Sequence, residues 1–216
     1  MTGTPDGGLQ WRTALKAQGL PIVAETIAYF LSTTAPEMDA KGAAAKGKIQ
    51  PPIRFDKDRE RLWRGIREGT LSVVDTDSLT YSAGFKESGD FCDCRVGVNM
   101  QVADTLALLF HEAINRRGID LVTLARVLSE NAALMYGIYP RKGAIAVGSD
   151  ADLVLLDQDK ELTLGRHRYR GRCDYSLWDG RTVKGAPVMT FLRGKLVMEN
   201  GEVIGDKGSA IRSSRR

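Results

Sequence analysis

The stretch from Tyr139 to Asp157 constrains the fold more than any other part of the chain, because it marks a change from helical to extended backbone. Pro140 ends the helix predicted before it, since proline has no backbone donor and a fixed φ. Gly143 and Gly148 supply tight turns on either side of a predicted short strand. The run Leu153–Leu156 is continuously apolar, which predicts a strand buried on both faces. The stretch is therefore expected to lead from a helix into a sheet.

Strands and helices alternate before this stretch, and short strands follow it. The predicted strands are Pro21–Glu25 and Leu71–Asp75, and the predicted helices are Leu9–Gln18, Asp56–Gly69, Thr105–Arg116 and Leu121–Tyr136. Beyond residue 143, glycine turns separate short strands, and Asn200-Gly201 is a favourable hairpin turn. This order predicts an α/β part with parallel strands at residues 1–142, a small β-sandwich at residues 143–205 and a flexible basic tail at residues 206–216.

Composition argues against several classes of protein. The chain has 216 residues, of which 43% are hydrophobic and 27% charged, as is typical of a globular protein with a real core. The net charge of +4 is small and gathers in the tail, which favours a solvated terminus over a nucleic-acid partner. No apolar run approaches the roughly 18 residues of a membrane span, and the first residues lack the features of a signal peptide. Three cysteines without framework spacing favour a reducing compartment, so we expect a cytoplasmic protein.

Acidic residues end the second predicted strand. Leu71–Val74 runs directly into Asp75-Thr76-Asp77, and parallel α/β barrels place reactive groups at the carboxyl ends of their strands. A carboxylate there can bind a metal and act as a general base. The alternative is that Asp75 or Asp77 merely caps a turn, and the spacing alone favours that alternative. The irregular segment from Tyr81 to Gln101 follows, and loops of this length inside a compact domain are often functional.

Several short motifs occur together in one order. They are Glu25-Thr26, Lys48–Arg54, Leu62-Trp63, Val74–Asp77, Gly97–Asn99, Leu108–Glu112, the stretch from Tyr139 to Asp157, and Arg193–Val197. In combination they resemble the cyclic amidohydrolases of the dihydropyrimidinase and hydantoinase family over about residues 20–205. The resemblance implies an α/β fold: the C-terminal portion of a (β/α)8 TIM-type barrel followed by a small β-sandwich, with the barrel incomplete in this chain.

The resemblance also implies roles for individual residues. Asp77 corresponds to the family's catalytic aspartate, which binds one metal of a binuclear zinc pair and takes the proton of the attacking water. This is chemically reasonable because a metal lowers the pKa of bound water toward about 7 and a nearby carboxylate can carry the proton. Gln50, Val96 and Gly97 fall where the family contacts the cyclic substrate through its backbone. The resemblance therefore implies hydrolysis of an amide C–N bond in a small cyclic ureide or imide.

The chain departs from the family pattern at its expected substrate contacts. Ser78 stands where the family most often has histidine, Gln50 where it has serine or glycine, and Arg95-Val96 where it has proline and asparagine. Because the family makes the contacts at Gln50 and Val96 through the backbone, side-chain changes there need not abolish them, but the identity of the substrate is open. Cys92-Asp-Cys94 is a single close pair, whereas a structural zinc site needs four ligands, so no zinc knuckle is expected.

Most of the family's metal ligands have no counterpart here. The family site needs a His-x-His, a bridging lysine and two further histidines, and this sequence has no His-x-His. Its two histidines, His111 and His167, are not expected to be ligands. A (β/α)8 barrel also needs about 250 residues. The resemblance thus implies a chain that is inactive alone, binds no stoichiometric zinc alone, and needs a missing N-terminal portion or further copies, since the family forms homotetramers.

Two other interpretations stay open. The family includes members that have lost metal ligands and act as oligomeric scaffolds, and Ser78 mildly favours that alternative. The chain is also compatible with a gene remnant that has no function, although its turn glycines and helix caps argue weakly against long decay.

Overall fold

The computed structural model describes residues 10, 12–15, 17–20, 22–79, 81–87, 90, 92–93, 96–97, 102–169 and 173–205. The predicted first helix falls partly inside these ranges, where residues 10, 12–15 and 17 are helical. The predicted basic tail at residues 206–216 and Cys94 lie outside the described residues. None of the helices in the described part has the length and apolar character needed to cross a bilayer.

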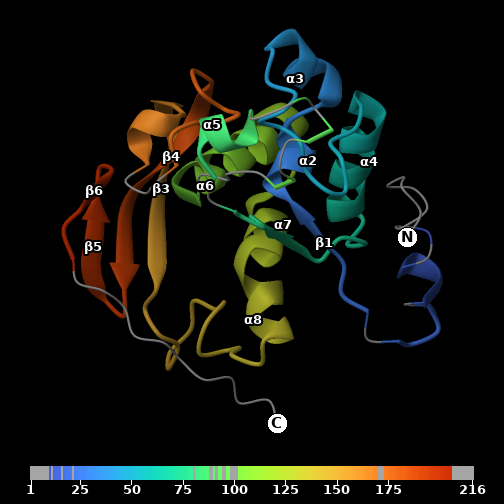
Figure 1. The fold of residues 1–216 in the computed structure, drawn as a ribbon. Helices are drawn as coiled ribbons and strands as arrows, with labels where there is room; N and C mark the ends of the chain where they lie inside the picture. The colour runs from blue at the N-terminus through green and yellow to red at the C-terminus, as the bar shows by residue number, and fades with distance from the viewer. Residues whose placement is uncertain are drawn as a thin grey trace.

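Two parallel strands and the helices between them form the first part of the chain (Figure 1). The order is β1 (Glu25–Ile27), α2 (Ala28–Ser32), α3 (Ala35–Ala40), α4 (Asp56–Arg67) and β2 (Val73–Asp75). Glu25 lies opposite Val73, and Ile27 lies opposite Asp75. The strand predicted at 21–25 is wrong in position, because only Glu25–Ile27 runs beside β2; just before it, the Ala24 carbonyl accepts from the Ser72 amide at 2.8 Å.

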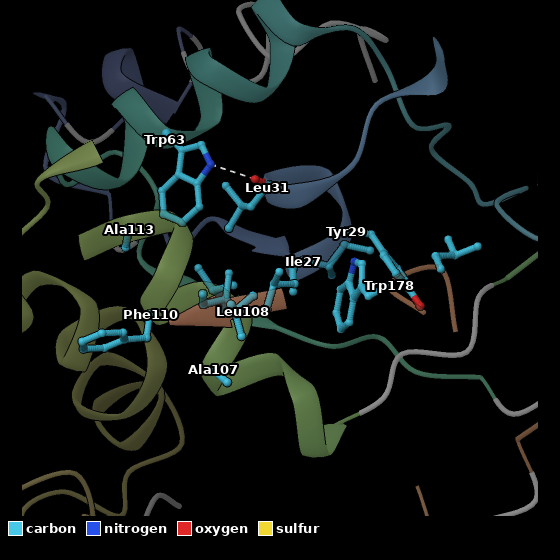
Figure 2. Packing of buried hydrophobic residues seen from close by; sticks show 14 of the residues in the cluster. Ile27, Tyr29, Leu31, Trp63, Ala107, Leu108, Phe110, Ala113 and Trp178 are labelled. Carbon is cyan, nitrogen blue, oxygen red and sulfur yellow. Dashed lines mark hydrogen bonds between the residues drawn. The ribbon is translucent and has the colours of Figure 1, made fainter. Parts of the chain in front are cut away.

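Helix α4 confirms the predicted helix at 56–69 and shows why it packs inward. The Phe55 amide donates to the Asp58 carboxylate at 3.2 Å, which satisfies a free donor at the start of the helix. Trp63 and Ile66 are 3% and 2% exposed, as their spacing predicts. The Trp63 indole Nε1 donates to the Leu31 carbonyl at 2.8 Å, so α4 is fixed to α2 by a buried hydrogen bond (Figure 2).

The predicted helices at 105–116 and 121–136 are confirmed, and each contains a π-helical segment. The first consists of α6 (Val102–Phe110) and η1 (His111–Asn115), and the second of α7 (Leu121–Ala125), η2 (Arg126–Glu130) and α8 (Asn131–Met135). The buried face of α6 is wide, because Ala107 and Leu108 are buried together with Leu109 and Phe110. Helix α6 contacts both α2 and the later sheet, so apolar residues are needed on both of its sides.

An antiparallel sheet follows the helices. Its order is β3 (Leu153–Thr163), β4 (Thr182–Leu192), β5 (Lys195–Glu199) and β6 (Glu202–Val203), with a 3-10 turn, η3 (Arg166–Arg168), between β3 and β4. The predicted hairpin at Asn200-Gly201 is confirmed: both residues have positive φ, 49° and 90°, as such a tight turn requires. That this sheet belongs to a β-sandwich stays a prediction.

Two predictions for the stretch from Tyr139 to Asp157 are wrong. Residues 144–147 form no strand, and Ile145 is 90% exposed. Val154 and Leu155 are 48% and 46% exposed, so β3 is not buried on both faces. Within the described part of the chain β3 is an edge strand that pairs with β4, and the described elements leave Val154 and Leu155 open to solvent. A continuous apolar run indicates a strand that packs against other apolar surfaces, but it does not show that those surfaces belong to the same chain.

One hydrophobic core joins the α/β part to the sheet (Figure 2). The rings of Tyr29 and Trp178 lie 4.8 Å apart between centroids. The Trp178 indole Nε1 donates to Ser32 Oγ at 3.2 Å, and Trp178 itself is 1% exposed. Val183 at the start of β4 is equally buried. Side chains from before and after residue 143 therefore share the same core.

Replacement of Gly185 by alanine is expected to destabilise the protein by about 2–3 kcal/mol. Gly185 has a φ of +102°, and a Cβ atom there would lie 2.1 Å from Cδ1 of the Phe110 ring. The ring is itself buried, so it has little room to move. Thermal unfolding would measure the loss. Gly84→Ala is the matched control, because its Cβ meets nothing within 4 Å and alanine favours a helix, so its stability should not fall. Equal midpoints for the two variants would contradict the prediction.

Candidate active site

Asp77 follows the carboxyl end of β2, where the sequence predicts a reactive group. Its side chain is exposed, and its backbone has a positive φ of 43°. Asp75, the last residue of β2, is also exposed. Partial burial raises the pKa of Asp75 above its ordinary 3.8, and the negative charges of Glu25 and Asp77 raise it further. Asp75 and Asp77 therefore make the carboxyl end of β2 acidic, whereas Glu25 lies at the amino end of β1, opposite Val73.

The segments that carry Gln50 and Gly97 lie side by side. The Gly97 amide donates to the Lys48 carbonyl at 3.0 Å, two residues before Gln50. Gln50 is exposed and precedes Pro51 through a cis peptide bond. Val96 is 40% exposed, whereas Gly97 is buried. The structure therefore brings together the three residues for which a substrate contact is predicted.

The segment after Asp77 packs against Gly97. Gly97 has a φ of +114°, and a Cβ atom there would lie 2.7 Å from Leu79 Cδ1 and 3.2 Å from Tyr81 Cε2. Glycine is required at this position both for the backbone conformation and for the close approach of Leu79. Leu79 lies two residues after Asp77, so one short stretch connects the acidic end of β2 to the Gln50 and Gly97 segments.

Lys86 is a member of this site that the sequence analysis missed. It ends α5 (Ala83–Lys86), its side chain is 0% exposed, and its Nζ donates to the carbonyls of Lys48 at 2.8 Å and Gly97 at 2.5 Å. One signal was present in the sequence: Lys86 is the only lysine between Lys57 and Lys142, in a region that otherwise uses arginine. A lone lysine in a functional loop can mark a buried ammonium group, because lysine and arginine are not interchangeable there.

The described residues do not form a metal site by themselves. No group of three or more histidine, cysteine, aspartate and glutamate side chains in the described part is placed to hold an ion. His111 Nδ1 accepts from the Lys184 amide at 3.1 Å, His167 lies in η3, and Cys92 is exposed. A binuclear zinc pair needs more ligands than Asp77 and its acidic neighbours offer, so the described residues do not fit that group.

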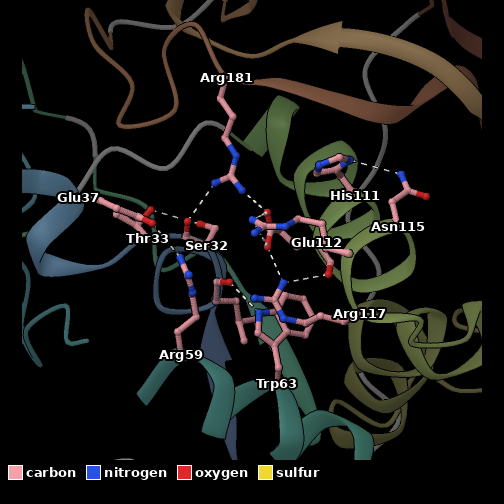
Figure 3. Close-up of polar contacts among 12 residues, drawn as sticks. Ser32, Thr33, Glu37, Arg59, Trp63, His111, Glu112, Asn115, Arg117 and Arg181 are labelled. Carbon is pink, nitrogen blue, oxygen red and sulfur yellow. Dashed lines mark hydrogen bonds and ion pairs between the residues drawn. The ribbon is translucent and has the colours of Figure 1, made fainter. Parts of the chain in front are cut away.

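A buried carboxylate lies between the helices and the sheet (Figure 3). Glu112 in η1 is 0% exposed, pairs with Arg116 at 3.1 Å and with Arg117 at 2.5 Å, and also pairs with Arg181, which precedes β4. Burial alone would raise the pKa of Glu112, but the three arginines outweigh burial and hold the pKa below its ordinary 4.5. This cluster contains no predicted site residue, and its role is to join the two parts of the chain.

Known proteins of similar sequence are hydantoinases. The chain is 30% identical over 192 residues to a D-hydantoinase of Rhizobium radiobacter and 32% identical over 213 residues to an L-hydantoinase of Paenarthrobacter aurescens. These alignments cover 88% and 98% of the chain but only 42% and 46% of the relatives. The chain therefore spans less than half the length of the curated relatives it matches.

Solved structures agree with the sequence comparison. A D-hydantoinase from a Bacillus species superimposes with a TM-score of 0.87 at 30% identity, covering 96% of this chain and 47% of that one. An L-hydantoinase from Arthrobacter aurescens gives a TM-score of 0.86 at 29% identity, covering 95% and 45%. These hydantoinases have a TIM-barrel fold, and the part matched by this chain corresponds to a partial barrel, as predicted.

The family assignment rests on a match over most of the chain. Residues 15–197 match the model described as the Amidohydrolase family. The match includes both parallel strands, the helices from α2 to α8 and most of the antiparallel sheet. This chain belongs to the amidohydrolase family.

Proposed function

We propose that this chain supplies the C-terminal part of a metal-dependent hydrolase that opens cyclic amides of the hydantoin and dihydropyrimidine type. Membership of the amidohydrolase family and similarity to D- and L-hydantoinases support hydrolysis of a cyclic ureide. The observation that carries the proposal is the position of Asp77, exposed just past the carboxyl end of β2 and connected through Leu79 to Gly97. Reactive groups in parallel α/β barrels lie at this end of the strands.

In this proposal each predicted site residue has one role. Asp77 would carry the proton of the reaction and would be one ligand of a metal whose other ligands the described residues do not supply. The backbone at Gln50, Val96 and Gly97 contacts the ring of the substrate. The adjacency of these segments, through the hydrogen bond from Gly97 to Lys48, supports a shared contact surface. Backbone groups suit a ring with amide donors and acceptors, because each can offer one hydrogen bond in a fixed direction.

We further propose that the chain is inactive without the rest of a barrel and works in a homo-oligomer or with an N-terminal portion, in the cytoplasm. The share of the relatives that it spans, 42% to 47%, supports incompleteness. The exposed Val154 and Leu155 on β3 support a missing cover for the sheet, which a β-sandwich would provide. Cys92 and Cys173 are free thiols, which supports a reducing compartment.

Two preparations test this proposal. One is the purified chain with added zinc, and the other is the chain co-expressed with the part of the L-hydantoinase of Paenarthrobacter aurescens that it does not match. Ring opening of hydantoin and dihydrouracil is followed by ultraviolet absorbance, and bound zinc by elemental analysis. We expect turnover and stoichiometric zinc only in the second preparation. Turnover by the chain alone would contradict its incompleteness. A folded assembly with neither zinc nor turnover would instead favour the non-catalytic scaffold.

A further inference from the structure

The Lys86 side chain carries a positive charge that is buried away from solvent. Its side chain is 0% exposed, and it ends a helix of only four residues. Burial of a lysine ammonium is costly unless polar partners satisfy it. Here two of its partners are backbone carbonyls, those of Lys48 and Gly97, at 2.8 and 2.5 Å. A charge that binds main-chain oxygens from two separate segments fixes the positions of both segments.

The two segments are those that carry the proposed substrate contacts. Lys48 lies two residues before Gln50, and Gly97 is itself a proposed contact. The Gly97 amide also donates to the Lys48 carbonyl at 3.0 Å. The Lys86 ammonium therefore bonds to both residues of a backbone pair that is already hydrogen-bonded. When the backbone of a residue makes a contact, the side chain of that residue does not set the geometry of the contact. The geometry depends on the interactions that hold the backbone in place.

We propose that Lys86 is a positioning residue that sets the distance between the Gln50 and Gly97 segments, so that one small cyclic ureide can reach both. This inference rests on the proposed function. A rigid ring has a fixed separation between its hydrogen-bonding groups, so binding weakens when the two protein segments move independently. Lys86 does not touch the substrate. It acts by keeping both segments in the arrangement that binding requires, which avoids the cost of ordering them in each catalytic cycle.

Helix α5 is anchored without the Lys86 ammonium. The Ala83 amide donates to Asp174 Oδ1 at 2.8 Å, and the Phe85 amide donates to Ser82 Oγ at 3.2 Å. The Tyr81 and Phe85 rings also pack with their centroids 5.1 Å apart. Replacement of Lys86 by methionine keeps most of the apolar stem and removes only the charged group. The variant is therefore expected to fold with α5 in place.

The test uses Lys86→Met in whichever preparation opens the ring. We expect KM for hydantoin to rise about tenfold while kcat changes less than about threefold, as loss of binding to ground and transition states alike predicts. Amide hydrogen exchange should become faster at residues 48–50 and 96–97 and stay unchanged in α6. Lys41→Met is the matched control, because Lys41 is exposed at the end of α3. It should change neither KM nor exchange.

Chemical rescue separates positioning from general stability. Lys86→Cys is made in a background in which Cys92, Cys94 and Cys173 are replaced by alanine, so that only residue 86 carries a thiol. Alkylated with 2-bromoethylamine while unfolded in urea and then refolded, it regains an ammonium at nearly the same reach. We expect it to regain most of the lost affinity, whereas Lys86→Met treated in the same way should not. An unchanged KM in Lys86→Met would overturn this inference and leave the proposed function standing. Faster exchange across α6 as well would also overturn it, because the role would then be structural. Absence of turnover in the unsubstituted protein would overturn both.

Discussion

Asp77→Asn should lower kcat/KM for ring opening by about 10³-fold in the assembled protein, the range expected for loss of a general base. Asparagine has nearly the same shape as aspartate. Its amide does not accept a proton at neutral pH and has no negative charge with which to bind a metal. The exposed position of Asp77 outside the core means that the substitution removes no buried contact. Initial rates over a range of hydantoin concentrations measure the effect.

Two matched substitutions control for this result. Asp39→Asn makes the same chemical change on the exposed surface of α3 and should leave the rate unaltered. Asp75→Asn tests the neighbouring carboxylate. If Asp77 alone carries the proton, this variant should keep at least roughly a tenth of the kcat/KM of the unsubstituted protein. If Asp77→Asn retains activity within tenfold, or if Asp75→Asn is the more damaging change, the assignment of the catalytic carboxylate to Asp77 is wrong.

Glu112→Gln should destabilise the protein by about 3 kcal/mol, because it removes the carboxylate that pairs with Arg181 and leaves Arg117 with Glu60 as its acidic partner. The Arg117 and Arg181 side chains are 10% and 24% exposed, and both point toward Glu112 (Figure 3). Urea unfolding followed by tryptophan fluorescence would report the loss, since Trp63 and Trp178 are both buried in the core. Glu130→Gln is the control: its pair with Arg126 is exposed, and its removal should cost less than about 0.5 kcal/mol.

The effect of Glu112 should also depend on pH. Its pKa in the folded protein lies below the ordinary 4.5, so the carboxylate contributes stability above about pH 4.5 that is lost as the pH falls through the folded pKa. The difference between Glu112→Gln and the unsubstituted protein should therefore be full at pH 7 and shrink as the pH falls below 4.5. A difference that stays constant down to pH 3 would show that the charge of Glu112 is not the source of its contribution.

Local rules predicted much of the fold because they depend on neighbours in sequence. The spacing of Trp63 and Ile66 was sufficient to place α4, and Asn200-Gly201 was sufficient to place a hairpin. Rules of this kind do not predict burial when the surface that would bury a side chain is not close to it in sequence. Val154 and Leu155 are as apolar as buried residues, yet they are exposed because no element in the described part of the chain packs over them.

The candidate site was predictable only in part, for a similar reason. The position of Asp77 follows from the end of a strand, which a local pattern can locate. Lys86 and Glu112 were missed because their partners lie far away along the chain: the Lys48 carbonyl is 38 residues from Lys86, and Arg181 is 69 residues from Glu112. Periodicity carries no information on such pairs. The resemblance to hydantoinases predicted substrate contacts at Gln50, Val96 and Gly97, but it did not predict the lysine whose ammonium binds the backbone of both segments.

The shared core has a consequence for how the chain folds during synthesis. Ser32 and Trp178 are hydrogen-bonded across 146 residues of sequence, and Tyr29 packs against the same indole ring. A nascent chain emerges from the ribosome N-terminus first, so the α/β part is complete long before its last core residue appears. Until Trp178 and Val183 have emerged, Tyr29 and its apolar neighbours stay open to other chains and to chaperones. The interval between the synthesis of Tyr29 and that of Trp178 is therefore expected to be prone to aggregation, because the residues that cover Tyr29 are still missing.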